Sequence, residues 1–315
     1  MTLRPLLHIG YAKAGSSWLQ RNLFNNPLFG FVSPLERTAL CQAIAFPTDF
    51  EFDARAARSM FQAAAATADA AHRMPVFSEE RFVGIMHSGG IDGRIIADRL
   101  VEVLPEARIL IVIREQNSMI RSAYGEYVKV GGAAALQHYL TDYQPYSLAL
   151  FRDKFYFYHG LIDAYVRRFG KERVLVLPFE LLRESPARFA GAILNFCDLP
   201  TPHGEAAEAI YGAKNNVGLS CFEVAMTRHM NFWFGHRCPH NSTSVLPILP
   251  AGSRRLWFAG LRRITRLVPQ GITGAMEARM KAAVAAYAGE RFAESNRETA
   301  RLTGLDLEAY GYKVR

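Results

Sequence analysis

The first 24 residues contain a strand, a glycine-bounded turn and a helix in direct succession. The segment 4–10 is short and mostly apolar, which is typical of a buried strand. A turn over 11–15 follows, and apolar residues at 19, 23 and 24 then recur at helical spacing. A loop between a strand and a helix offers backbone N–H groups and a helix N-terminus to an anion. This order therefore predicts a phosphate-binding unit near the amino end of the chain.

Strands and helices continue to alternate up to about residue 200. The segment 108–113 is almost wholly apolar, as expected at the centre of a parallel sheet. Further strands are predicted over 76–78 and 173–177. Helices are predicted over 50–72, from Asp92 to Pro105, and over 118–130, 151–169 and 186–196. The pattern predicts an α/β fold of P-loop type in three layers, with a central, mainly parallel β-sheet flanked by helices and a helical C-terminal part.

The turn has the glycine spacing of a nucleotide-binding loop but places its lysine elsewhere. Gly10 and Gly15 are separated by four residues, and Ser16 and Ser17 follow. A G-x-x-x-x-G-K-[ST] loop has lysine at the position of Ser16, and that lysine reaches the β- and γ-phosphates. Here the lysine is Lys13, three residues earlier. We therefore expect it to contact a different part of the ligand.

The stretch Gly10-Tyr11-Ala12-Lys13-Ala14-Gly15-Ser16-Ser17-Trp18-Leu19 resembles the 5′-phosphosulfate loop of sulfotransferases. These enzymes use 3′-phosphoadenosine-5′-phosphosulfate (PAPS). The resemblance implies that the donor is bound by Ala12, Lys13, Ala14, Gly15, Ser16, Ser17 and Trp18. It also implies that Lys13 stabilises the bridging and leaving oxygens. Ala12 stands where the family commonly has proline, a change that loosens the turn but removes no ligand contact.

A second motif follows the strand 108–113. Arg114 ends this strand, and Ser122 lies eight residues later, which resembles the family's 3′-phosphate motif. Gln116 replaces the usual proline. A guanidinium suits a dianionic phosphate in both charge and geometry. The resemblance implies that Arg114 and Ser122 hold the 3′-phosphate and so select PAPS over an ordinary adenylyl donor.

Other parts of the chain are also similar to this family. The segment 173–182 looks like the late strand of the family, and 287–312 looks like the C-terminal end of bacterial members. The segment 214–220 resembles the loop that closes over the nucleotide, which implies that Asn215 and Asn216 bind the donor. A soluble bacterial member that releases 3′,5′-ADP is expected. No metal is expected, and the carboxylates suggest no metal site.

A hydroxyl acceptor needs a base, and one candidate lies after the strand 76–78. Carboxyl ends of strands in such a sheet face the ligand crevice. Ser78, Glu80 and Phe82 match a Ser-x-Glu-x-[LF] pattern of bacterial relatives, which implies Glu80 as the general base. Glu79 and His87 remain alternatives.

One histidine sits inside the first predicted strand. The simplest interpretation of His8 is a core residue whose ring is satisfied.

We expect one sulfotransferase domain over 1–315. In this interpretation 1–200 form the nucleotide-binding core, and 201–315 form a helical and loop-rich part that closes over donor and acceptor. The acceptor side is expected to come from 31–75, 125–155 and 232–250. The acceptor itself is not specified: a small molecule, a glycan, a lipid headgroup and an amine all fit.

The chain carries 37 Lys and Arg against 29 Asp and Glu, a net charge of +8. Such a charge favours an anionic ligand, a nucleic acid or a membrane surface. No nucleic acid is expected, because basic residues cluster only at 254–263. That segment is amphipathic and could touch a membrane, although packing of its apolar face on the domain is the simpler interpretation.

No apolar run approaches the ~20 residues of a membrane span, and no export signal is apparent, so a cytoplasmic location is expected. Two alternatives stay open. A P-loop kinase of a small molecule predicts lysine at position 16 and a strand-end aspartate for magnesium, and the sequence has neither. A non-catalytic nucleotide- or anion-binding protein is consistent with the charge alone. The oligomeric state is left open.

Overall fold

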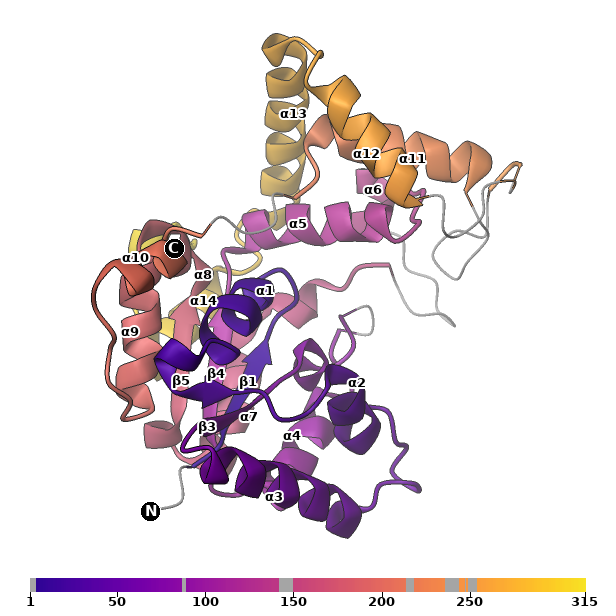
Figure 1. The fold of residues 1–315 in the computed structure, drawn as a ribbon. Helices are drawn as coiled ribbons and strands as arrows, with labels where there is room; N and C mark the ends of the chain where they lie inside the picture. Colours follow the sequence, from indigo (N-terminus) through magenta and orange to yellow (C-terminus); the bar gives the residue numbers. More distant parts are fainter. Residues whose placement is uncertain are drawn as a thin grey trace. The chain divides into compact units, whose positions relative to one another are not determined.

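The computed structural model describes residues 4–86, 89–141, 150–213, 218–235, 244–246, 248 and 254–315. Its five described strands form a parallel sheet in the order β2-β3-β1-β4-β5 (Figure 1). They are β1 (Leu6–Gly10), β2 (Phe31–Val32), β3 (Met74–Ser78), β4 (Arg108–Ile113) and β5 (Val174–Pro178). The predicted α/β fold with a central parallel sheet flanked by helices is confirmed.

Helices and short turns occupy most of the connections. In the first half these are α1 (Ser16–Trp18), a π-helix η1 (Leu19–Phe24), η2 (Pro27–Phe29), α2 (Arg37–Leu40), η3 (Cys41–Ala45), α3 (Ala54–Ala70), η4 (Glu80–Val83), α4 (Gly93–Val103), α5 (Gln116–Lys129) and α6 (Leu136–Thr141). In the second half these are η6 (Asp153–Tyr156), α7 (Tyr158–Phe169), η7 (Lys171–Arg173), α8 (Phe179–Glu184), α9 (Pro186–Phe196), α10 (Glu205–Tyr211), α11 (Cys221–Phe234), α12 (Arg254–Thr265), α13 (Gln270–Ala288), α14 (Ala293–Thr303) and η9 (Glu308–Tyr310).

Burial explains why the central strands form where the sequence predicts them. Every residue of β1 and β3 is buried, as are the last five residues of β4. Strands covered by helices on both faces need apolar residues on both faces, which produces continuous apolar runs. The short strand β2 has only two residues and gave no such signal.

Several predicted helices begin or continue differently. The helix after the first loop turns into the π-helix η1, and the helix expected from 151 begins only at Tyr158. Asp92 precedes α4 but does not cap it with its side chain. Its carboxylate instead accepts the N–H of Ile85 at 2.7 Å and pairs with Arg81 at 3.0 Å. A tertiary contact therefore takes the place of the predicted cap.

The chain divides into two compact units. The first consists of 1–115, 153–215 and 290–315 and carries the sheet. The second consists of 116–152 and 216–289, and its described regular elements are helices. These units do not follow the predicted division at residue 200, because 290–315 belong to the unit with the sheet. The single functional domain stays a prediction. None of the described helices is both long and apolar enough to span a bilayer.

Candidate active site

The loop between β1 and α1 has an unusual backbone. Lys13 and Gly15 both have left-handed conformations, with φ of 70° and 94°. The N–H of Ala14 donates to the carbonyl of Tyr11 at 3.1 Å and closes the turn. A Cβ atom on Gly15 would lie 2.9 Å from Cδ2 of Leu182, so glycine allows the loop to pack against α8. Turns of this kind form concave backbone sites for anions.

The three residues of α1 differ in what they can offer a ligand. Ser17 is exposed at the start of the helix. The Ser16 hydroxyl is buried and has no hydrogen-bond partner among the described residues. A buried hydroxyl in this state costs about 1–3 kcal/mol, which a ligand oxygen would offset. The two serines therefore suit an anion at this loop.

Trp18 has its side chain in the core. The indole lies edge-on to Phe189, with 6.4 Å between ring centroids. The backbone N–H of Trp18 donates to the Gly15 carbonyl at 2.9 Å. Its described role is packing. The predicted donor contacts of Trp18, Ala12 and Ala14 stay predictions.

Arg114 follows β4 and reaches the loop. Its Nη1 donates to the carbonyl of Lys13 at 2.8 Å, and its guanidinium lies over the Phe179 ring at 4.8 Å. The Tyr158 hydroxyl donates to the Arg114 carbonyl at 2.5 Å. The structure thus brings together the two cationic residues of the separate predicted motifs. No sequence pattern predicts that Phe179 and Tyr158 contact Arg114.

The remaining predicted donor residues lie in the second unit or outside the described residues. Ser122 lies on α5 in the second unit and is half-buried, so its pairing with Arg114 stays a prediction. Asn215, Asn216 and the alternative base His87 lie outside the described residues. Among the residues that are described, no group of three or more His, Cys, Asp or Glu could hold a metal ion.

The two candidate carboxylates after β3 have different surroundings. The Glu79 carboxylate accepts hydrogen bonds from Arg37 at 2.9 and 3.1 Å and from the Arg81 N–H at 3.1 Å. Its side chain is only 4% exposed. The Glu80 side chain is 31% exposed, and its Oε2 lies 3.7 Å from Nη2 of Arg37. Glu79 is therefore engaged in holding the backbone, whereas Glu80 is accessible.

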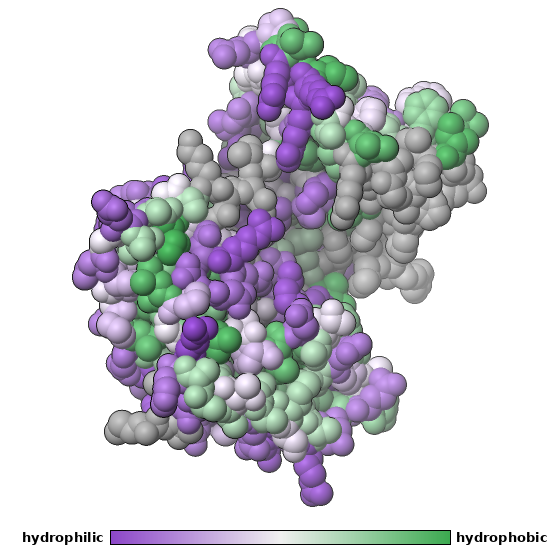
Figure 2. Space-filling view, in the orientation of Figure 1, coloured by the Kyte–Doolittle hydropathy of each residue, from purple (hydrophilic) through white to green (hydrophobic). Residues whose placement is uncertain are grey.

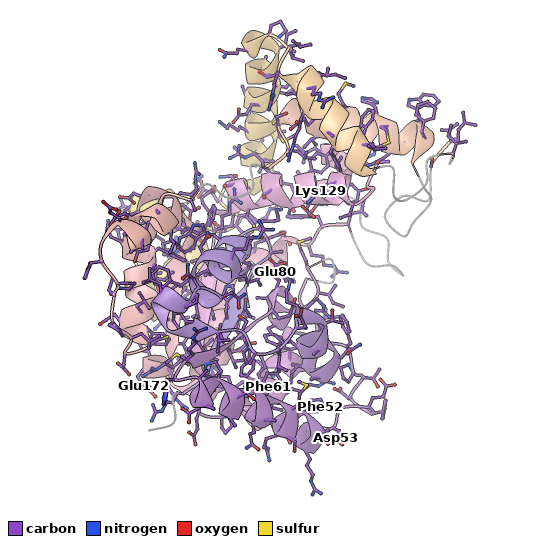
Figure 3. The ribbon with its side chains drawn as sticks, in the orientation of Figure 1. Phe52, Asp53, Phe61, Glu80, Lys129 and Glu172 are labelled. Carbon is purple, nitrogen blue, oxygen red and sulfur yellow. The ribbon has the colours of Figure 1, made fainter. Side chains whose placement is uncertain are left out.

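Glu80 also lies at the end of the sheet where a ligand is expected. Figure 3 shows it at the opposite end from Glu172, which precedes β5. The loop after β1, Glu80 after β3 and Arg114 after β4 all follow the carboxyl ends of adjacent parallel strands. Ligands of open α/β sheets bind beyond these ends.

His8 is not the satisfied core residue that its position in the strand predicts. Its Nδ1 lies 2.7 Å from Oγ of Ser78, and this Oγ accepts a hydrogen bond from Gln20 at 3.0 Å. Its Nε2 has no partner among the described residues. A Cβ atom on Gly10 would lie 2.7 Å from this Nε2, so the ring requires glycine at that position. Burial, reinforced by the charge of Arg37, lowers the pKa of His8 to about 3, and the ring is neutral.

A hydrogen bond to Glu180 holds the C-terminal segment close to Arg114. The Glu180 carboxylate accepts the Glu115 N–H at 3.1 Å and the Tyr312 hydroxyl at 3.1 Å. Burial raises the pKa of Glu180, although these hydrogen bonds and Arg114 act in the opposite direction. The sequence marks Glu180 only as a residue after the late strand. Its partner Tyr312, 132 residues later, could not be predicted from spacing.

Residues 96–203 match the model of the sulfotransferase family, which is about a third of the chain. This match confirms the family resemblance predicted from the sequence and supports a transferase that carries out sulfuryl transfer. It includes Arg114 but not the loop at 10–18. The loop is therefore a separate observation. No curated protein matches the chain.

Three solved structures are similar to the chain. The sulfotransferase from Alicyclobacillus acidocaldarius is 21% identical, covers 68% of this chain and 87% of its own, and has a TM-score of 0.48. The sulfotransferase domain from the curacin biosynthetic pathway is 12% identical, with coverage of 84% and 99% and a TM-score of 0.42. Mouse sulfotransferase SULT7A1, complexed with PAP, is 8% identical, with coverage of 89% and 90% and a TM-score of 0.36. Because all three TM-scores are below 0.5, the resemblance to the family depends on the sequence match over 96–203.

Proposed function

We propose that the protein transfers a sulfuryl group from PAPS to a hydroxyl or amine acceptor and releases 3′,5′-ADP. The observation that carries this proposal is the contact between Arg114 and the Lys13 carbonyl. Arg114 lies in the segment 96–203 that matches the family model. Lys13 lies in the loop 10–18 after β1, which that match does not include and which has the form of a phosphate-binding loop. The unpartnered Ser16 hydroxyl supports an oxyanion at the same loop.

Each residue has a defined task in this proposal. Lys13, Ser16 and Ser17 bind the 5′-phosphosulfate, and Arg114 binds the 3′-phosphate together with Ser122. Asn215 and Asn216 close over the nucleotide. Lys13 stabilises the charge that develops on the leaving oxygen, which is the largest contribution in transfers of this kind.

The transfer is an in-line displacement at sulfur. The acceptor oxygen forms the new S–O bond while the bond to the 5′-phosphate oxygen breaks, and Glu80 takes the acceptor proton. No residue in this scheme requires a metal ion. Glu80 is favoured over Glu79 because Arg37 and the Arg81 N–H already occupy the Glu79 carboxylate.

Calorimetric titration with 3′,5′-ADP tests the donor directly, with 5′-AMP and ATP–magnesium as controls. Tight binding of 3′,5′-ADP and weak binding of both controls are expected. Preference for ATP–magnesium would favour the P-loop kinase, and no nucleotide binding would favour a different anion-binding function. The Arg114→Ala variant should lose the preference for 3′,5′-ADP over 5′-AMP, because it removes the cation assigned to the 3′-phosphate.

The helices of the second unit support an additional proposal about location. Leu267, Ile264 and Ile272 are 83%, 55% and 52% exposed around the junction of α12 and α13. Exposed Arg263 directly precedes Ile264 in the sequence, and exposed Arg266 directly precedes Leu267. Figure 2 shows hydrophobic and hydrophilic side chains together at this end of the two helices. Exposed apolar residues among basic ones suit an anionic lipid surface, whereas pairing of two copies would bring like charges together. We propose peripheral contact with anionic lipid here.

A further inference from the structure

A polar cavity of about 260 Å³ lies in the first unit beside the end of β3. Ser78, the last residue of β3, lines it, and Glu79 and Glu80 follow directly in the chain. Gln20, on the helix that continues from the phosphate-type loop, lines it as well. The cavity therefore lies between the helix that follows the proposed donor loop and the end of β3 that leads to the proposed base. The other lining residues are Asn25, Ser33, Leu35, Glu36 and Arg37.

The lining of this cavity is built for hydrogen bonding. Asn25 joins its two sides, since its amide donates to the Gln20 carbonyl at 2.9 Å and accepts the Ser33 N–H at 3.3 Å. The Ser33 hydroxyl is buried and has no partner among the residues that the structure describes. Leu35 is the single aliphatic side chain of the lining. A flat apolar acceptor would leave these polar groups unsatisfied, whereas a hydroxyl-bearing acceptor would pair with them.

The charge around the cavity is negative, although the whole chain carries +8. Arg37 is its cation, and the Arg37 guanidinium contacts the carboxylates of Glu79 and Glu80. Glu36 adds a third carboxylate, which lies in the lining itself. The nearby Arg81 pairs with Asp92. The lining itself holds one carboxylate and one guanidinium. The carboxylates of Glu79 and Glu80 beside Arg37 make the surroundings negative, which disfavours an anionic acceptor at this position.

We propose that this cavity is the acceptor subsite, and that it selects an uncharged or amine-bearing, hydroxyl-rich acceptor against anionic ones. Ser33 and Glu36 are its specificity-determining residues. The inference rests on the proposed sulfuryl transfer. Because the volume of about 260 Å³ is just below the usual range for ligand pockets, about 300–1,000 Å³, the occupant is a small polar molecule or the terminal ring of a larger one. The positive net charge of the chain then attracts the anionic donor, while the negative charge around the cavity discriminates against anionic acceptors.

A second cavity has a mainly apolar lining with two cations, in contrast to the polar cavity beside β3. It lies in the second unit, measures about 280 Å³ and is lined by Lys129, Leu219, Phe258, Ala259 and Arg262. Apolar walls with two cations would suit an apolar anion. A preference for such an acceptor would therefore assign acceptor binding to this cavity and overturn the proposal.

The test uses the full-length protein saturated with 3′,5′-ADP. Binding of methyl glucoside, glucosamine, glucuronate and 4-nitrophenol is measured by ligand-observed NMR, and initial rates of sulfation are then measured with PAPS. Methyl glucoside or glucosamine should bind at least about fivefold tighter than glucuronate. Equal or tighter binding of glucuronate or 4-nitrophenol, or no binding of either favoured sugar, would overturn the proposal.

Two variants locate the effect. Ser33→Ala should weaken sugar binding about three- to tenfold while the Kd for 3′,5′-ADP and the melting temperature stay unchanged. Glu36→Gln should reduce the discrimination against glucuronate, and the matched control Glu106→Gln, at an exposed carboxylate before β4, should not. If neither variant moves acceptor binding, the assignment of this cavity is wrong. If the wild-type protein does not bind 3′,5′-ADP, the proposed function itself is wrong.

Discussion

The two compact units use their arginines differently. In the first unit, Arg37 binds Glu79, Arg81 pairs with Asp92, and buried Arg99 binds Asp49. Arg99 also donates to the carbonyls of Ile44 and Pro47, both at 2.8 Å. These cations fix loops at the sheet.

In the second unit, the exposed Arg262, Arg263 and Arg266 form no ion pair with any described residue. An arginine that is already paired stabilises the chain, whereas an unpaired one is available to an external anion. The comparison teaches that net charge alone does not locate function. Arg37, Arg81 and Arg99 stabilise the first unit, whereas Arg262, Arg263 and Arg266 of the second unit face the surroundings.

The largest test of this comparison concerns the carboxylates held by Arg37. Glu80→Gln should lower kcat about 10²- to 10⁴-fold and leave the Kd for 3′,5′-ADP unchanged, because it removes only the proton acceptor. Glu79→Gln should lower the melting temperature and retain most of kcat, since it removes a partner of Arg37 and the Arg81 N–H. Steady-state kinetics and calorimetry measure both variants. Near-normal turnover in Glu80→Gln would transfer the role of base to Glu79 or His87.

Lys13→Ala should have the next largest effect. Loss of one positioned donor to a developing oxyanion costs about 10²- to 10³-fold in kcat. The fold should persist, because the Arg114 contact uses the backbone carbonyl of Lys13 and not its side chain. The substitution Arg262→Ala in the second unit is the matched control and should not change kcat. A similar loss of kcat in that control would remove the functional distinction between the units.

The sheet and the cationic motifs could be predicted because each depends on a local pattern. The buried run 108–113 and the Gly10–Gly15 spacing are both visible within a few residues. The contacts that select among the candidates could not be predicted, because they join residues far apart. Arg37 meets Glu79 across 42 positions, and Arg114 meets the Lys13 carbonyl across 101. No hydrophobic periodicity or motif spacing in the sequence predicts contacts between residues so far apart.

The buried polar residues of the first unit should also make its stability depend on pH. The pKa of His8 is about 3 in the folded protein and about 6.5 when the chain is unfolded. Above pH 6.5 the ring is neutral in both states, so His8 adds no pH dependence.

Between pH 6.5 and about 3 the unfolded chain binds a proton that the folded protein excludes. His8 should therefore lower the free energy of unfolding by about 1.4 kcal/mol for each pH unit of acidification in that window. Chemical denaturation of wild type and His8→Gln at pH 7 and pH 5 measures this difference. Parallel loss of stability in both proteins would show that the His8 ring titrates normally.

The smallest expected effect is in the second unit. Arg263→Ala should weaken binding to phosphatidylserine-containing vesicles about fivefold, since each basic residue near an anionic surface contributes about 1 kcal/mol. Leu267→Ser should weaken it as well, because Leu267 is 83% exposed and would enter the interface. The matched control Arg55→Ala removes an exposed arginine of the first unit and should leave vesicle binding unchanged. Vesicle co-sedimentation at two salt concentrations measures all four proteins. Because the attraction is between exposed charges, added salt should weaken wild-type binding toward that of Arg263→Ala. Equal loss in Arg55→Ala and Arg263→Ala would mean that net charge, and not the junction of α12 and α13, brings the protein to the surface.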